Sequence, residues 1–296
     1  MRRRPATGSS SWARLVAGWI FSGAAILFFP GCAATRQQQT DSLPSRHAVR
    51  SHQVLLLSDQ KVPGEEEVLA ELGQVRARIT DELGVPPGER EVVVYLFSDR
   101  DRYASYMRAT HPNLPARRAF FIGTPKELAV YAHWGDHILV DLRHEYTHGL
   151  LHAAVGHVPL WIDEGIAEYM EVGSDEIGNV NREHLGRLAQ TASQGWRPDL
   201  KRLERLEEVG EMSREDYHEA WAWVHYLLHQ APGGQQLLSE YLVELRRGQS
   251  PTPISARLGN DLAAVEGQVA RYVVQLGAGD HVVPATFRLQ SAESPE

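Results

Sequence analysis

The chain has 296 residues, of which 43% are hydrophobic, so it is long enough to bury a sizeable core. Its 38 acidic residues outnumber its 30 basic ones and give a formal net charge of −8. An acidic chain without a basic run interleaved with aromatic residues argues against nucleic acid as a partner. A single cysteine, Cys32, excludes an intrachain disulfide.

The first 32 residues have the pattern of an export signal. Arginines at positions 2 to 4 precede an apolar run from Leu15 to Phe29 that is too short for a comfortable transmembrane helix. The run leads to Gly31-Cys32, which resembles a bacterial lipobox, so we expect Cys32 to be lipidated. An ordinary signal peptide cut elsewhere, or an uncleaved anchor, also fits. We therefore expect an exported protein, anchored as a lipoprotein in a bacterial cell envelope.

Composition and periodicity divide the rest of the chain into a tether, two folded parts and a tail. Residues 33–50 are polar and aperiodic, which predicts a flexible tether. Residues 51–137 mix strand and helix patterns, residues 138–276 are mostly helical, and residues 277–296 read as a disordered tail. The order predicts an α+β fold, in which a small mixed lobe is followed by a helical lobe.

The predicted elements of the first lobe follow from short apolar runs and from capping residues. A helix over 68–83 ends at Gly84, and Ser98 or Asp99 caps a helix that runs through Met107. The predicted strands are 54–57, 92–97, 119–122 and 128–132.

The next predicted helix, 138–154, carries the sequence His144-Glu145-Tyr146-Thr147-His148. Residues four apart share a helix face, so the two imidazoles point together and can supply two ligands of a zinc site. Glu145 follows the first histidine directly, where its carboxylate can take a proton from a water in the open position. A second short helix follows and reads W-I-D-E-G-I-A-E from Trp161 to Glu168.

The two motifs together resemble the gluzincin metallopeptidases, and most closely the peptidase MA-like group of bacterial metallopeptidases. The resemblance extends over about residues 51–276, with specific motifs only in 144–169. It implies a thermolysin-like zinc helix that holds one Zn²⁺ per chain, with Glu164 as the third ligand. It also implies that Glu168, four residues later, hydrogen-bonds a ligand imidazole and so fixes its tautomer.

Other third ligands are open to consideration. His152 lies four residues after the second motif histidine, and His157 lies in the following turn, but the metzincin pattern does not match. Asp163 precedes Glu164 and is rotated from it by about 100° on a helix. We expect Glu164 to be the ligand.

Beyond the motifs the chain is mostly helical, with predicted helices at 182–192, 200–209, 213–228, 237–246 and 262–276. The resemblance implies that a tyrosine or histidine from this part stabilises the oxyanion of the tetrahedral intermediate. Tyr217, which opens its helix, is our candidate, and the alternatives are His218, His225 and Tyr226. An aromatic stripe at this spacing is more often core than catalytic.

Thermolysin-like folds also bind the peptide substrate along an edge strand beside the zinc. By this analogy the strand at 128–132 is the candidate for binding the substrate. The alternative, that it is an ordinary strand of the sheet, is equally favoured.

These features predict a zinc-dependent peptidase in which Glu145 is the general base and peptides or proteins are the substrate. Contact with a membrane is expected only through the lipid anchor or signal sequence. One alternative is an exported envelope lipoprotein whose zinc site is not catalytic and which acts as a binding or structural module. A second is a hydrolase of another amide. The intact Glu145 favours an enzyme, because a structural site has no use for a free carboxylate.

Overall fold

The computed structural model describes residues 42–173 and 180–279, all of which fall within one compact unit. The predicted export signal with Cys32 and most of the predicted tail lie outside the described residues. No helix in the described part of the chain is both long and apolar enough to cross a membrane.

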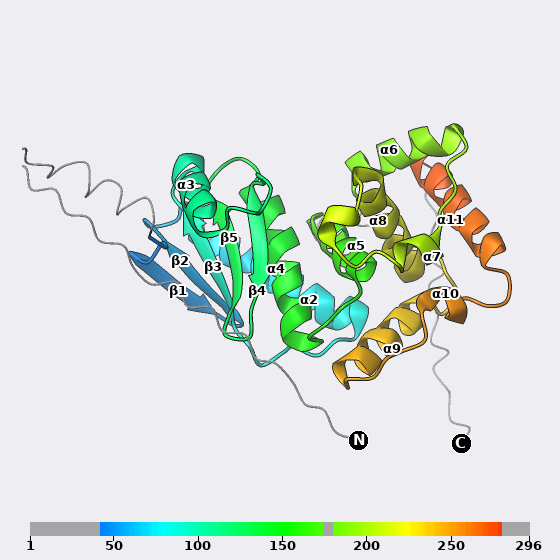
Figure 1. The fold of residues 1–296 in the computed structure, drawn as a ribbon, viewed down its shortest axis with the longest axis horizontal. Coiled ribbons are helices and arrows are strands. Elements are labelled where there is room, and N and C mark those ends of the chain that lie inside the picture. The colour runs from blue at the N-terminus through cyan, green and yellow to red at the C-terminus, as the bar shows by residue number, and fades with distance from the viewer. Residues whose placement is uncertain (1–41, 174–179, 280–296) are drawn as a thin grey trace, which may run out of the picture. The chain divides into compact units, whose positions relative to one another are not determined.

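A five-stranded mixed sheet forms the N-terminal part of this unit (Figure 1). Its order is β1-β2-β3-β5-β4, in which the three inner strands are parallel and the two edge strands are antiparallel to their neighbours. All six residues of the central strand β3 are buried, as its unbroken apolar run predicts. The strands are β1 (His47–Ser51), β2 (Val54–Ser58), β3 (Val92–Phe97), β4 (Ala119–Gly123) and β5 (Leu128–His133).

Helices cover both faces of the sheet. The side chains of β3 alternate, so that Val92, Val94 and Leu96 join one core with α2 (Glu65–Leu83) and α4 (Ile138–Ala154). The side chains between them join a second core with α3 (Arg100–Thr110), which Asp99 caps as predicted. In α4, Gly149 lies against the sheet, because a Cβ there would come within 2.7 Å of a methyl carbon of Val92.

The C-terminal part is helical, and α4 lies between it and the sheet (Figure 1). α5 (Leu160–Met170) is buried along its whole length and packs closely on α8 (Arg214–His229). Gly165 permits this approach, because a Cβ there would lie 2.7 Å from the carbonyl oxygen of Ala220. The other helical segments are α6 (Arg182–Ser193), α7 (Leu200–Leu203), the 3₁₀ helix η2 (Val209–Glu211), α9 (Gly234–Arg246), α10 (Ile254–Arg257) and α11 (Leu262–Gly277). The predicted α+β fold class is confirmed.

Three details of the prediction are wrong, and the first is the length of the tether. Residues 47–50 belong to β1, which pairs with β2 in an antiparallel hairpin. The side chains of β1 are all exposed or half-buried, so the strand is specified by backbone pairing rather than by an apolar pattern. An ion pair between Arg50 and Glu91 ties this edge strand to the loop before β3.

The helix predicted over 200–209 is also wrong. Only Leu200–Leu203 form α7, and Leu206 then donates its N–H to the carbonyl of Leu203 in a turn. The apolar side chains of this segment recur every three residues, at 200, 203, 206 and 209. In an α-helix of 3.6 residues per turn this spacing drifts around the surface, so it does not hold one buried face.

The strand proposed to bind substrate at the sheet edge is the third correction. β5 lies between β3 and β4 and is paired on both sides, so the edge strand is β4. The two strands form a hairpin closed at Thr124, whose N–H donates to the carbonyl of Glu127. Strand order depends on contacts between distant segments, which the local sequence does not encode.

Candidate metal centre

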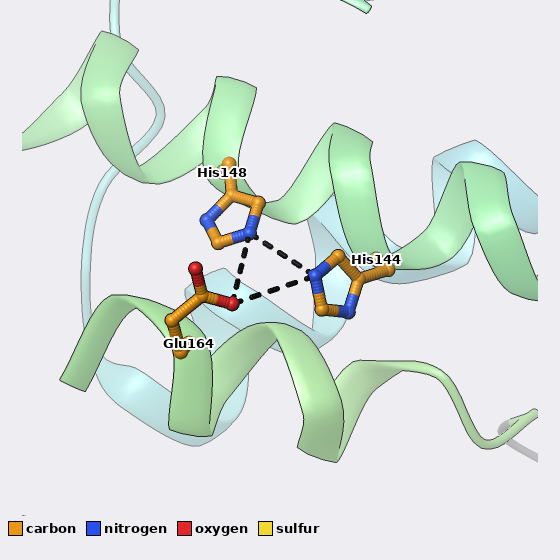
Figure 2. Close-up of side chains that lie close together, drawn as sticks. All are labelled: His144, His148 and Glu164. Carbon is orange, nitrogen blue, oxygen red and sulfur yellow. Dashed lines mark hydrogen bonds and ion pairs between the residues drawn. The ribbon is translucent and has the colours of Figure 1, made fainter. Parts of the chain in front are cut away.

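Two adjacent helices bring three side chains to one point (Figure 2). His144 and His148 project from α4, and their Nε2 atoms lie 3.2 Å apart. Glu164 projects from α5, and its Oε2 lies 3.6 Å from Nε2 of His144 and 3.7 Å from Nε2 of His148. These three side chains form a possible metal-binding group of two imidazole nitrogens and one carboxylate oxygen.

The donor atoms fit a metal ion in both spacing and chemistry. Ligand atoms about 2.1 Å from a tetrahedral ion lie about 3.4 Å from one another, close to the three separations observed. Among the described residues, Glu164 Oε2 is buried without a hydrogen-bond partner. A buried carboxylate oxygen is costly when left unpaired, and a cation at this point would satisfy it.

The outer nitrogens of both imidazoles face further carboxylates. Nδ1 of His144 lies 3.0 Å from Oε1 of Glu171, the residue that follows α5. Nδ1 of His148 lies 3.0 Å from Oδ2 of Asp163. Carboxylates in these positions hold each ring in place and direct its Nε2 lone pair toward the shared point.

This concentration of negative charge alters the protonation of the histidines. Burial acts to lower the pKa of His148, but the carboxylates of Asp163 and Glu164 outweigh it and raise that pKa to about 9. Burial opposes the shift at His144 as well, yet Glu164 and Glu171 raise its pKa well above the ordinary value. The same potential that favours a proton on these rings favours a metal cation between them.

Glu145 lies beside the cluster with its carboxylate held in place. The backbone N–H of Phe121, in the edge strand β4, donates to its Oε2 at 2.6 Å. Burial raises the pKa of Glu145, and the neighbouring imidazoles of His144 and His148 oppose that rise. Glu145 and all three members of the cluster line a recess of about 910 Å³, here called the metal-site recess, so this carboxylate borders an open space.

The alternative third ligands occupy other places. His152 directs its Nε2 to Oδ2 of Asp163, 3.1 Å away, and both residues line the metal-site recess. Asp163 thereby contacts two histidines, His148 and His152, while His157 is exposed in the loop after α4. Of the candidates weighed from the sequence, Glu164 is the one that meets both Nε2 atoms.

The contact predicted for Glu168 is made by a different residue. Oε2 of Glu168 lies 2.9 Å from Nε2 of His184 in α6, whereas Glu171 makes the hydrogen bond to His144. Glu164, Glu168 and Glu171 follow one another at i, i+4 and i+7, and because Glu171 continues the helical backbone at the C-cap of α5, the three share one face. Burial raises the pKa of Glu171, but His144 and His184 outweigh it and hold that pKa at about 2.

Tyr217 is one of two candidates for oxyanion stabilisation that share a recess with His144. Its hydroxyl accepts a hydrogen bond of 3.3 Å from Arg117, and it lines a recess that also contains His144. His218 lines the same recess. His225 and Tyr226 instead bond to α11, through the hydroxyl of Tyr272 and the side chain of Gln268.

Arg117, Glu171 and His184 are residues of this region that the sequence reading missed. A signal existed for Glu171, because it lies two helical turns after Glu164. Arg117 belongs to the loop before β4 and His184 to a separate helix, so their proximity comes from the tertiary fold alone.

The chain is similar to a family described as a protein of unknown function (DUF1570) over residues 138–245. This stretch begins with α4 and ends within α9, so it contains the three residues of the metal-binding group together with Glu145, Glu171 and Tyr217. No curated protein matches the chain.

Proposed function

We propose that this chain is a zinc-dependent peptidase of the gluzincin type. The observation that carries the proposal is the convergence of His144, His148 and Glu164 at one point, with Glu145 beside it in an accessible recess. Two histidines and a glutamate are the ligand set of thermolysin-like catalytic zinc sites, which keep a fourth position open.

His144, His148 and Glu164 would hold the zinc ion, which when bound polarises the scissile carbonyl and lowers the pKa of a water to about 7. Glu145 then acts as general base, and it passes the proton it gains to the leaving amine. The bond from the N–H of Phe121 keeps the carboxylate aimed at the cluster.

The edge strand β4 is the proposed binding site for the peptide backbone. The N–H of Phe121 donates to Glu145, so the unpaired side of β4 faces the site rather than β5. A peptide that adds to this edge as a further strand would place its backbone next to Glu145, whatever its side chains. Phe120, Phe121 and Ile122 of this strand line the metal-site recess and offer it apolar surface.

Hydrolysis of a peptide library, measured with and without a chelator, tests the proposal. We expect the zinc-loaded protein to cleave peptides and the chelated protein to be inactive. Glu145→Gln should keep its zinc and lose hydrolysis by a factor of about 10² to 10⁴. Equal activity in the variant and the wild type would refute the assigned role of Glu145.

The same experiment separates the alternatives. Bound zinc without turnover of any substrate would favour the non-catalytic binding or structural module. Turnover restricted to amides other than peptides would favour the broader hydrolase.

We further propose that the protein is exported and held at a cell envelope through lipidated Cys32, because its N-terminal sequence resembles a signal peptide with a lipobox. Mass spectrometry of the mature N-terminus tests this. Its expected result is a lipidated Cys32 as the first residue, and an unmodified first residue other than Cys32 would overturn it.

A further inference from the structure

A second recess, of about 840 Å³, adjoins the metal centre, and we call it the basic recess. It shares His144 and Arg117 with the metal-site recess, so the two hollows meet at the metal centre. Among the described residues, five arginines and three glutamates line it. This excess of cations is unexpected in a chain with a formal net charge of −8.

The glutamates of the basic recess are already engaged. Glu168 pairs with His184, Glu171 bonds to His144, and Glu183 lies 3.4 Å from the guanidinium of Arg187 on the same helix. They therefore contribute little negative charge that a ligand in the recess would have to overcome.

Two of the arginines are engaged as well. Arg118 makes a bidentate pair with Asp141, with bonds of 2.7 and 3.0 Å. Arg143 lies 2.9 Å from Glu71 and also donates to the carbonyl of Glu171. These two guanidinium groups stabilise α4 and are already paired with protein carboxylates.

The other three arginines, Arg117, Arg182 and Arg214, have no carboxylate within ion-pair distance in the described part of the chain. Arg182 and Arg214 are exposed on the first turns of α6 and α8, and Arg117 donates to the neutral hydroxyl of Tyr217. Burial, with help from His184, Arg187 and Arg214, lowers the pKa of His218 to about 4. The positive field of Arg214 therefore reaches this side chain on the wall of the recess.

We propose that the basic recess binds a carboxylate of the substrate, next to the bond that is cleaved, so that acidic peptides are the preferred substrates. A guanidinium group presents a fork of donors that matches a carboxylate, and charge-assisted bonds of this kind are stronger than neutral ones. Because His144 borders both recesses, a peptide that passes the metal centre along β4 extends into the basic recess. This inference rests on the proposed peptidase function and adds a substrate class to it.

Two sources can supply the carboxylate, namely an acidic side chain or the free C-terminus of the peptide. Matched peptides distinguish them. One set has both ends blocked and carries Glu or the isosteric Gln at each position on either side of the cleaved bond. The other set carries only neutral side chains and ends in a free carboxylate or in an amide.

Within a matched pair of peptides, we expect the zinc-loaded wild type to cleave the Glu peptide with a kcat/KM about tenfold higher than that of the Gln peptide. The double variant Arg182→Gln/Arg214→Gln should reduce this preference to about twofold or less while retaining its zinc. Raising the salt concentration should weaken the preference in the wild type, because these groups are exposed to solvent. Arg271→Gln, which removes an exposed arginine of α11, is the control and should leave the preference unchanged.

The outcomes separate this inference from the peptidase proposal. Cleavage without any preference for a carboxylate, or a preference that the double variant keeps, would overturn the inference and leave the peptidase intact. A preference only for the free C-terminus would assign the recess to terminal carboxylates and overturn the role of acidic side chains.

If the wild type cleaves none of the peptides, a binding measurement tests whether the basic recess recognises a carboxylate. Fluorescence anisotropy of labelled, end-blocked Glu and Gln peptides with zinc-loaded Glu145→Gln then measures recognition without turnover. Tighter binding of the Glu peptide, lost when Arg182→Gln and Arg214→Gln are added, would support the recess although the peptidase proposal had failed. Equal binding of both peptides would refute it.

Discussion

His144 and His148 on α4, and His225 and His229 on α8, are two pairs of histidines with the same spacing of four residues and with different partners. His144 and His148 on α4 have ring centroids 4.9 Å apart, and His225 and His229 on α8 have centroids 4.5 Å apart. The first pair faces the carboxylate of Glu164 and borders a recess. The second pair is packed among aromatic side chains.

The partners of the α8 pair are hydroxyl groups. Nδ1 of His225 lies 2.8 Å from the hydroxyl of Tyr272, and Nε2 of His229 lies 2.9 Å from the hydroxyl of Tyr169. A hydroxyl satisfies an imidazole nitrogen without attracting a cation, whereas a carboxylate does both. Histidines four apart on a helix therefore supply neighbouring rings, and the contacts made by the adjacent helix decide whether those rings form a metal site.

The largest expected effect comes from removing one histidine of each pair. His148→Ala should weaken zinc binding by on the order of a thousandfold, because it removes a ligand. His229→Ala should bind one zinc with unchanged affinity and lose about 1–3 kcal/mol of stability, because it opens a gap in a packed region. Competition with a chromophoric chelator and thermal unfolding measure the two effects. Loss of zinc in the α8 variant would contradict the comparison.

The acids behind the α4 pair give the next largest effect. Glu171→Gln should weaken zinc binding by roughly 10–100-fold, because Glu171 orients the ring of His144. Glu168→Gln is the matched control on the same helix face, and it contacts His184 instead. We expect less than about a threefold change for it. If the two variants changed zinc affinity equally, the assignment of Glu171 as the orienting acid would fail.

Gly165 tests the packing of α5, which carries Glu164, against α8. Gly165→Ala should destabilise the protein by about 2 kcal/mol, because its Cβ meets the backbone of Ala220. Gly186→Ala in α6 is the control, since nothing lies within 4 Å of its added Cβ among the described residues. That change should stabilise α6 by about 0.5–1 kcal/mol. Chemical denaturation measures both, and an unaffected Gly165→Ala protein would contradict the close approach.

The smallest effect concerns the protonation of buried histidines. A carboxylate partner and a hydroxyl partner predict opposite shifts of the histidine pKa. At His184 burial is outweighed by Glu168 and Glu171, and its pKa rises to about 9, whereas burial lowers the pKa of His229. A raised pKa stabilises the fold below pH 6.5 and loses that contribution as the pH rises through 9. A lowered pKa stabilises the fold above pH 6.5 and loses its contribution as the pH falls through the folded value.

Over the range from pH 6.5 to 9.5, the zinc-loaded wild type should therefore lose about 1–2 kcal/mol more stability than His184→Gln. NMR titration of the two imidazoles checks the directions independently. A lowered pKa at both His184 and His229 would show that burial, rather than the partner, sets both values.

The parts of this molecule that the sequence predicts are those whose cause is local. The bounds of α4 follow from apolar periodicity and from Gly156, and the shared face of His144 and His148 follows from helix geometry. The burial of β3 follows from its unbroken apolar run. What the sequence missed depends on contacts between distant segments.

Three cases show this dependence. The half-buried edge strand β1 exists through its pairing with β2 and carries almost no apolar signal. The place of β4 at the sheet edge follows from strand order, which puts β5 inside. Arg117 meets Tyr217 across 100 residues of sequence, so no pattern in either segment predicts the contact.

X-ray absorption at the zinc edge, on the full chain after metal analysis, tests directly whether His144, His148 and Glu164 hold a zinc ion. We expect one zinc per chain with two imidazole nitrogens and oxygen donors at about 2.0–2.2 Å, and one fewer protein oxygen donor in Glu164→Ala. A chain that binds no zinc at stoichiometric concentration, or a spectrum with no imidazole contribution and no response to that substitution, would contradict it.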